Sequence, residues 1–191
     1  MRRLVLFLMF LSVFATGVQA HSGSIGVYTD QSAVDCDLEI PSFVDAELYI
    51  VYFRSDSGPD GIKGAEFKAE FSITDFYLTF TPPTSVLIAG DVEDGIAMTF
   101  TDGCRGSGSS TVYLGKLEIF VNKAAITDWT IRILPNPEAE PATGDVIVLQ
   151  CDALQTLHAV LGGWFHEGEG NCELAAPETS SWGAIKSMYN E

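Results

Sequence analysis

Basic residues are scarce in this sequence. Its 191 residues include 10 Lys and Arg against 26 Asp and Glu, which gives a formal charge of −16. Nucleic acids and anionic membrane surfaces both require a basic footprint, so this balance argues against either partner. The sequence also lacks a Gly-x-Ser-x-Gly elbow, a nucleotide-binding glycine loop and a Cys-x-x-Cys pair. These absences favour a non-catalytic protein over an enzyme.

Long apolar runs are absent apart from one near the start. Two arginines precede the twelve-residue run Leu4–Ala15, and Val18 and Ala20 stand at the −3 and −1 positions of a signal-peptidase site. This run is too short to span a bilayer, which takes about 20 residues. The pattern predicts a signal peptide over residues 1–20 and a mature chain beginning at His21 with a charge of −18. We therefore expect a secreted protein, extracellular or periplasmic, with no membrane span after cleavage.

Export makes disulfides the expected state of the four cysteines, because oxidising compartments favour them. Four cysteines allow three pairings, and the sequence does not choose among them. The interpretation that we favour joins the closest pair, Cys151 and Cys172, and leaves Cys36 with Cys104. Each bond would contribute roughly 2–4 kcal/mol.

The mature chain is a series of short strands. The clearest is Ala65–Ile73, where apolar and polar residues alternate with the period of two that a half-buried strand requires. Gly- and Pro-rich turns separate these segments, and their spacing predicts an all-β antiparallel β-sandwich of about nine strands over residues 21–172. The other predicted strands are Ile25–Thr29, Ala46–Phe53, Phe76–Phe80, Val86–Ala89, Ile96–Phe100, Val112–Val121, Trp129–Leu134 and Val146–Leu149.

Two segments near the end leave alternatives open. Asp152–Leu161 is either a helix ended by two glycines or a strand that turns at Gly162-Gly163 into a hairpin with Trp164–His166. We favour the strands. Residues 173–191 are expected to form a linker and a short C-terminal helix, which either packs on its own domain or docks on a partner. The apolar face of that helix carries Trp182, Ile185, Met188 and Tyr189.

Residues 45–152 carry a weak family resemblance. The segments GIAMTFTD, GKLEIFVNKA, DWTIRIL and GDVIVLQ follow one another between turn-rich loops. This succession resembles the cohesin-like sandwiches of secreted bacterial proteins, which share fold ancestry with carbohydrate-binding modules. The resemblance implies a sandwich of the cohesin-like or immunoglobulin-like type that acts as a non-catalytic binding or structural module. Cohesins are usually repeated modules without disulfides, and dockerin binding does not follow from these segments.

Metal sites were the sharpest catalytic alternative. A mature N-terminal His21, together with His158 or His166, resembles the copper-chelating arrangement of secreted polysaccharide monooxygenases, and imidazole suits Cu(II). That alternative is a secreted polysaccharide-active enzyme. Acidic turn residues leave a calcium ion as a candidate cofactor, although none follows the EF-hand spacing. The acids of the calcium hypothesis are Asp56, Asp60, Asp91, Glu93, Asp94 and Asp102.

The favoured function is binding to a protein or glycan at the cell envelope or in the extracellular space. Glu167 and Glu169 resemble a paired-carboxylate site, but their glycine-rich surroundings indicate a solvated turn. Sugar rings stack on flat aromatic faces, so aromatics on the solvent side of a sheet would indicate a glycan. Alternation predicts that Tyr49 and Phe53 share one face of their strand and that Tyr52 lies on the other. The candidates are Tyr49, Tyr52, Phe53, Tyr77, Trp129 and Trp164.

Overall fold

The described part of the chain consists of strands and loops, without a helix. The computed structural model describes residues 22–35, 43–122, 129–139, 144–152 and 154–166. Its strands are β1 (Gly23–Tyr28), β2 (Asp45–Arg54), β3 (Ile62–Phe71), β4 (Phe76–Thr81), β5 (Val86–Asp91), β6 (Gly95–Phe100), β7 (Thr111–Val121), β8 (Thr130–Leu134), β9 (Val146–Gln150), β10 (Leu157–Gly162) and β11 (Trp164–His166).

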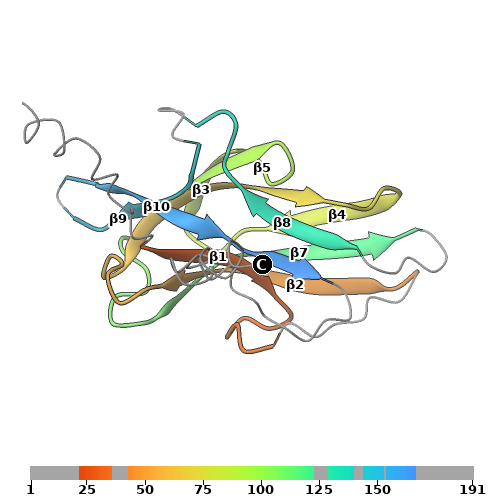
Figure 1. The fold of residues 1–191 in the computed structure, drawn as a ribbon, viewed down its shortest axis with the longest axis horizontal. Coiled ribbons are helices and arrows are strands. Elements are labelled where there is room, and N and C mark those ends of the chain that lie inside the picture. The colour runs from red at the N-terminus through yellow and green to blue at the C-terminus, as the bar shows by residue number, and fades with distance from the viewer. Residues whose placement is uncertain (1–21, 36–42, 123–128, 140–143, 153, 167–191) are drawn as a thin grey trace, which may run out of the picture.

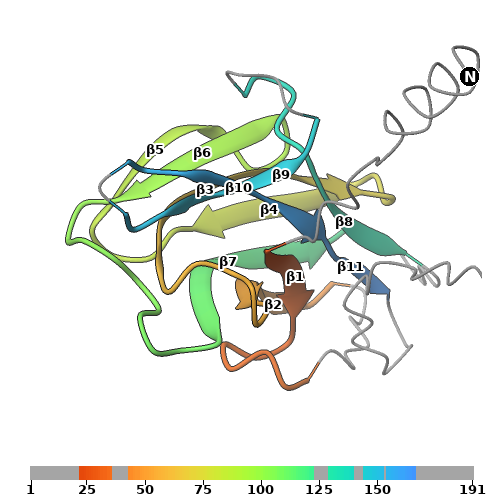
Figure 2. The same ribbon diagram turned by 60° about the vertical axis from the view of Figure 1, so that its left-hand side comes forward.

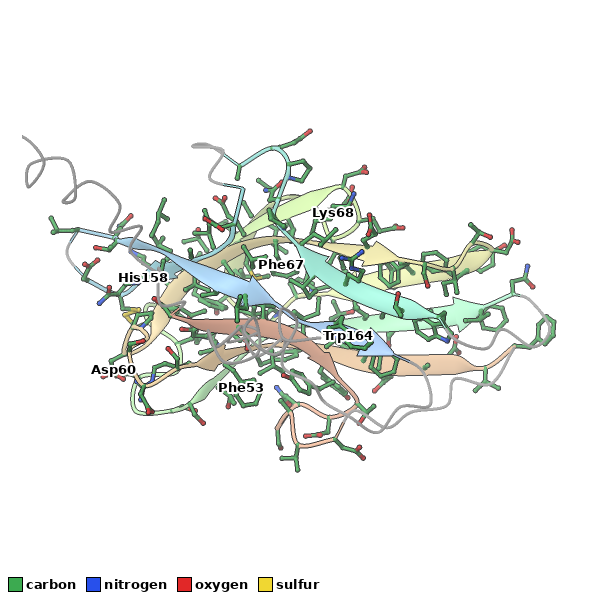
Figure 3. The ribbon with its side chains drawn as sticks, in the orientation of Figure 1. Phe53, Asp60, Phe67, Lys68, His158 and Trp164 are labelled. Atoms are coloured by element: carbon green, nitrogen blue, oxygen red, sulfur yellow. A yellow bond between two sulfur atoms is a disulfide. The ribbon has the colours of Figure 1, made fainter. Side chains whose placement is uncertain are left out.

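The strands predicted from alternation are confirmed. All nine are present, and each predicted end lies within three residues of the observed one. In β3, Ala65, Phe67 and Ala69 are buried, while Glu66 and Lys68 between them lie on the other side. Figure 3 shows Phe67 directed between the layers and Lys68 directed away from them. The alternation decides this geometry because successive side chains of a strand point to opposite faces.

The strands form one curled sheet that folds into two layers (Figure 1). One layer runs β5-β6-β3, and both β8 and β9 pair with the remaining side of β3, one after the other along its length. The second layer runs β1-β2-β7-β4. Among the described strands, β4, β5 and β11 each pair with a single strand, and β4 and β5 form the open edges of their two layers.

The segment β10–β11 joins the layers on the side away from those edges. β10 pairs antiparallel with β9 and parallel with β1, and β11 pairs antiparallel with β8. The favoured assignment of strands to this segment is therefore confirmed, but the predicted hairpin is wrong, because β10 and β11 follow one another instead of pairing. At Gly162 the chain passes so close to its neighbour that a Cβ would lie 1.9 Å from the carbonyl oxygen of Ile133. The sheet is also mixed, because one of its pairs is parallel.

Buried side chains from both layers fill the space between them. Phe67 and Phe100 come from the first layer, and Leu48 and Leu117 come from the second; none is more than 1% exposed. At one end of the core, the ring of Trp129 packs against the ring of Phe165 in β11, with centroids 5.6 Å apart. Fully burying such side chains supplies about 1.5–3 kcal/mol each, so this shared core holds the layers together.

The disulfide joins Cys104 to Cys151, with Cα atoms 5.7 Å apart. The favoured pairing of Cys151 with Cys172 is therefore wrong. Ile62 explains the observed bond, because it pairs with Gln150 on one side and exchanges two backbone hydrogen bonds with Arg105 on the other. Ile62 therefore holds Arg105, the neighbour of Cys104, and Gln150, the neighbour of Cys151, on its two sides. Nearness in sequence says nothing about such pairings.

Candidate functional site

An apolar surface covers the outer side of the first layer. Antiparallel partners point to the same face of a sheet, and the register places Leu87, Thr99, Gly64, Leu149 and Leu157 in one row across five strands. Leu87 is 67% exposed and Leu157 is 46% exposed. Glu66 and Lys68 of β3 lie on the same outer side, and we call only its apolar side chains the apolar face. It comprises Leu87, Ala89, Ala97, Leu149 and Leu157.

The loop after β8 crosses the outer side of this layer near the start of β6 (Figure 2). Gly95 has φ +143°, and a Cβ there would lie 2.1 Å from Oδ1 of Asn136. Asn136 and Ala139 are buried although they belong to a loop. Nearby on the same face, burial raises the pKa of the Glu66 carboxyl above its usual value. The loop therefore borders the apolar face near the start of β6, while Leu87 and Leu157 at the two ends of the row stay exposed.

Aromatic side chains line the outer side of the second layer. The rings of Tyr49 and Tyr113 lie 6.2 Å apart, and those of Tyr77 and Phe120 lie 6.2 Å apart. Phe53 lies on the same side (Figure 3), where its ring contacts Tyr28 at 5.5 Å. We call Tyr49, Phe53, Tyr77, Tyr113 and Phe120 the aromatic face. The alternation in β2 had placed two of them correctly on one side.

Charges lie among these rings. Nζ of Lys116 donates to Oε1 of Glu47 at 2.8 Å and to Oε1 of Glu118 at 2.9 Å. These carboxylates raise the pKa of the lysine, and hydrogen bonds from Lys116 and Tyr49 lower the pKa of Glu47. The Lys116 ammonium group is therefore held by the carboxylates of Glu47 and Glu118 on the aromatic face.

Of the other candidate aromatics, Tyr52 and Trp129 belong to the core. They are 1% and 2% exposed, so neither can stack on a ligand. Trp164 lies on the outer side of β11 and is 37% exposed (Figure 3). Sequence reasoning missed Tyr113 and Phe120, although both alternate with buried residues in β7.

The histidines do not assemble a metal site in the described residues. Nε2–H of His158 donates to Oε1 of Gln150 at 2.6 Å, which leaves Nδ1 to accept the Ser22 hydroxyl at 3.0 Å. His166 pairs through β11 with β8, whereas His158 pairs through β10 with β9. In the ranges that the structure describes, no group of three His, Cys, Asp or Glu side chains is arranged for a metal ion.

Three of the six acids of the calcium hypothesis, Asp60, Asp91 and Asp102, have local partners. Asp60 accepts hydrogen bonds from Arg54 and from the backbone N–H of Gly108 at 2.9 Å, and these bonds lower its pKa. Oδ1 of Asp91 accepts hydrogen bonds from the backbone N–H groups of Glu93 and Asp94 in the following turn. Asp102 pairs with Arg105. These contacts account for the side chains as turn caps and ion pairs.

Several predictions fall on residues outside the described ranges. No helix in the described ranges is long and apolar enough to cross a membrane. The signal peptide, the C-terminal helix and the solvated turn at Glu167 and Glu169 remain predictions. The candidate residues concerned are His21, Cys36, Glu167, Glu169, Cys172, Trp182, Ile185, Met188 and Tyr189.

Comparison with solved structures decides how this architecture is classified. A cohesin module from a Clostridium perfringens family 33 glycoside hydrolase matches with a TM-score of 0.57, over 78% of this chain and 97% of the module. The fold is cohesin-like. Sequence identity is 11%, so the likeness concerns the fold alone. No protein-family model matches the sequence, and no curated protein does.

Further cohesins match the same region with lower scores. The sixth cohesin of Acetivibrio cellulolyticus scaffoldin B, solved in complex with a dockerin, gives a TM-score of 0.48 and 14% identity over 76% of this chain and 99% of the cohesin. A non-cellulosomal cohesin from Archaeoglobus fulgidus gives 0.47 and 10% identity over 76% and 91%. The match to the Clostridium perfringens module confirms, at the level of fold, the resemblance drawn from residues 45–152.

Proposed function

We propose that this protein is an exported, non-catalytic binding module and that its ligand is a protein held on the apolar face. Three leucines of one register row carry the proposal, because Leu87 and Leu157 are exposed at its two ends and Leu149 lies next to Leu157. Water solvates such a row poorly, and exposed apolar patches mark protein-binding surfaces on soluble domains. The cohesin-like fold accords with this role, but a fold does not name a partner. The partner is therefore left as a protein with a complementary apolar surface.

The test replaces the leucines at the two ends of the row with aspartate. Leu87→Asp combined with Leu157→Asp keeps the strands and places two carboxylates on the apolar face. Leu154→Asp is the matched control, because Leu154 is 86% exposed and lies in the turn before β10, outside the register row. Each full chain is immobilised and exposed to the exported proteins of the source cells. Wild type and the control should retain the same partner, and the double variant should lose it by about tenfold or more. Equal capture by all three would refute the proposal.

Glycan binding is the second candidate, and the aromatic face favours it. Sugar rings stack on exposed aromatic rings, and Lys116 with its two carboxylates offers donors and acceptors beside Tyr49 and Tyr113. A glycan array should then give signals that Tyr49→Ala and Tyr113→Ala abolish and that Trp164→Ala, on the other layer, preserves. An array without signal would exclude this candidate and leave the protein ligand untouched.

Export and attachment complete the proposal. The signal-peptide pattern predicts that the released chain begins at His21, which N-terminal sequencing of exported protein would verify. Residues 174–191 are proposed to hold the module on its partner or on the envelope through their apolar positions. Deleting them should release the protein from the envelope fraction. Unchanged retention would overturn the docking role and leave the apolar face unaffected.

A further inference from the structure

The edge strand β5 is unusual because almost all of it is exposed. Every residue from Leu87 to Asp91 is exposed, and the first charge occurs at the last position. In the described part of the chain, β5 pairs with β6 alone. Natural proteins normally blunt such edges with charges, prolines or bulges, because an apolar edge recruits further strands. β5 has no proline and no charge before its end.

The free backbone groups of this edge can be assigned from the ladder. The N–H of Thr101 donates to the carbonyl of Ser85 at 2.8 Å, which marks these residues as a hydrogen-bonded pair. Hydrogen-bonded and non-bonded pairs alternate along an antiparallel ladder. The N–H and C=O groups of Val86, Ile88 and Gly90 therefore point to the open side, where an added strand would bind them.

A groove lies beside these groups. It has a volume of about 280 Å³ between β4 and β5, and it is lined by residues of β4, β5, β6 and the turn between β5 and β6, among them the acids Asp91 and Glu93. Leu78 and Phe80 form the β4 side, while Ile88 and Ile96 contribute from the other layer. Alternate side chains of a strand paired to β5 would enter this groove, because they would share the inward side with Ile88.

The negative charge beside the groove favours a partner with a basic side chain. Asp91, Glu93 and Asp94 are exposed at the end of β5, and the first of them is fixed by two backbone hydrogen bonds. A second copy of this chain would bring another −16 against the same face, and like charges repel. A basic side chain on the incoming strand would instead be attracted to this end.

We propose that the free edge of β5 binds an extended segment of a partner protein as an additional antiparallel strand, with apolar residues at alternate positions in the groove. A Lys or Arg at the N-terminal end of that segment lies beside Asp91 and Glu93, because antiparallel pairing brings this end to the end of β5. Strand addition of this kind is a recurrent mode of peptide recognition. The inference rests on the proposed protein-binding function and names the chemistry of the partner.

The test uses a defined probe on the full chain. The acetylated and amidated peptide Lys-Val-Thr-Val-Thr-Val-Thr is titrated into 15N-labelled protein while the backbone amides are followed by NMR. The amides of Val86, Ile88 and Gly90 should shift in a saturable manner. N-methylation of alternate peptide amides removes the main-chain hydrogen bonds and should weaken binding by about tenfold or more. Glu in place of the peptide's Lys should weaken it as well.

Two protein variants test the edge. Ile88→Lys places a charge on the free edge and should abolish binding of the peptide. Leu154→Lys is the matched control, because Leu154 is 86% exposed in the turn before β10, and it should leave binding of the peptide unchanged. Unaltered binding of the N-methylated peptide, or no saturable shift, would overturn the inference. Concentration-dependent shifts of β5 without peptide would also overturn it, in favour of a second copy. Partner capture that depends on Leu157 but survives Ile88→Lys would preserve the proposed function and remove only the strand addition.

Discussion

Replacing Cys104 and Cys151 together by serine should destabilise the protein strongly. The bond joins the loop after β6 to the turn after β9, across 47 positions of sequence. Cross-linking a loop of that length removes chain entropy from the unfolded state, which corresponds to about 4 kcal/mol at 25 °C. The two sites are already neighbours in the sheet through Ile62, so the fold itself should survive the substitution.

Urea unfolding of the full chain measures this effect. The double variant should lose about 4 kcal/mol in its free energy of unfolding, which for a chain of this size corresponds to about 8–16 °C in Tm. The comparison protein carries Cys36→Ser and Cys172→Ser, so that Cys104 and Cys151 are its only cysteines. Peptide mapping of that protein without reductant should recover the Cys104–Cys151 link.

Two results would refute this reasoning. A loss below about 1 kcal/mol would show that the bond does not restrict the unfolded chain as the loop length implies. A map of wild type that links Cys151 to Cys172 would show that the pairing itself is wrong. The same map reports the state of Cys36, which lies outside the described residues.

Three further predictions concern the core, the loop after β8 and alkaline pH. Phe67→Ala should cost about 3–5 kcal/mol in urea unfolding, because the ring is fully buried, whereas Lys68→Ala beside it should cost under about 0.5 kcal/mol; similar losses would contradict the assigned faces. Gly95→Ala should displace Asn136 and expose its loop to limited proteolysis, since a Cβ has no room there; an unchanged cleavage pattern would count against this contact. Burial raises the pKa of Tyr52 to about 12, so the unfolded chain loses this proton first and stability should fall between pH 10 and pH 12 by up to about 2.5 kcal/mol. Burial raises the pKa of Tyr28 to about 12 as well, so Tyr52→Phe should make that part of the stability profile less steep without removing the slope, and an equally steep profile in the variant would exclude Tyr52 as a source.

The sequence predicted what depends on neighbouring residues. Alternation along β3 or β7 decides which side chains are buried, because a strand presents consecutive residues to opposite faces. The same rule placed Tyr49 and Phe53 together and Tyr52 on the opposite side. For the segment after Asp152 the rule was less decisive, yet the preference for strands was confirmed.

The predictions that failed depended on pairing between distant segments. The hairpin at Gly162 was wrong because β10 finds partners in β9 and β1, more than a hundred residues apart from one another in sequence. The disulfide prediction relied on nearness in sequence, whereas strand pairing through Ile62 brings the observed partners together. Neither partner can be read from local periodicity, because many registers satisfy the same alternation.

For the candidate binding surfaces, too, the sequence determined the local properties and the tertiary structure determined the arrangement. The sequence by itself determined that this is an acidic, all-β chain with one apolar face per strand, since those properties follow from composition and from the two-residue period. Only the tertiary structure decided that β5 is an edge and that Leu87 and Leu157 belong to one exposed row. An edge exists because no further strand pairs there, which is a property of the whole sheet and of no single segment.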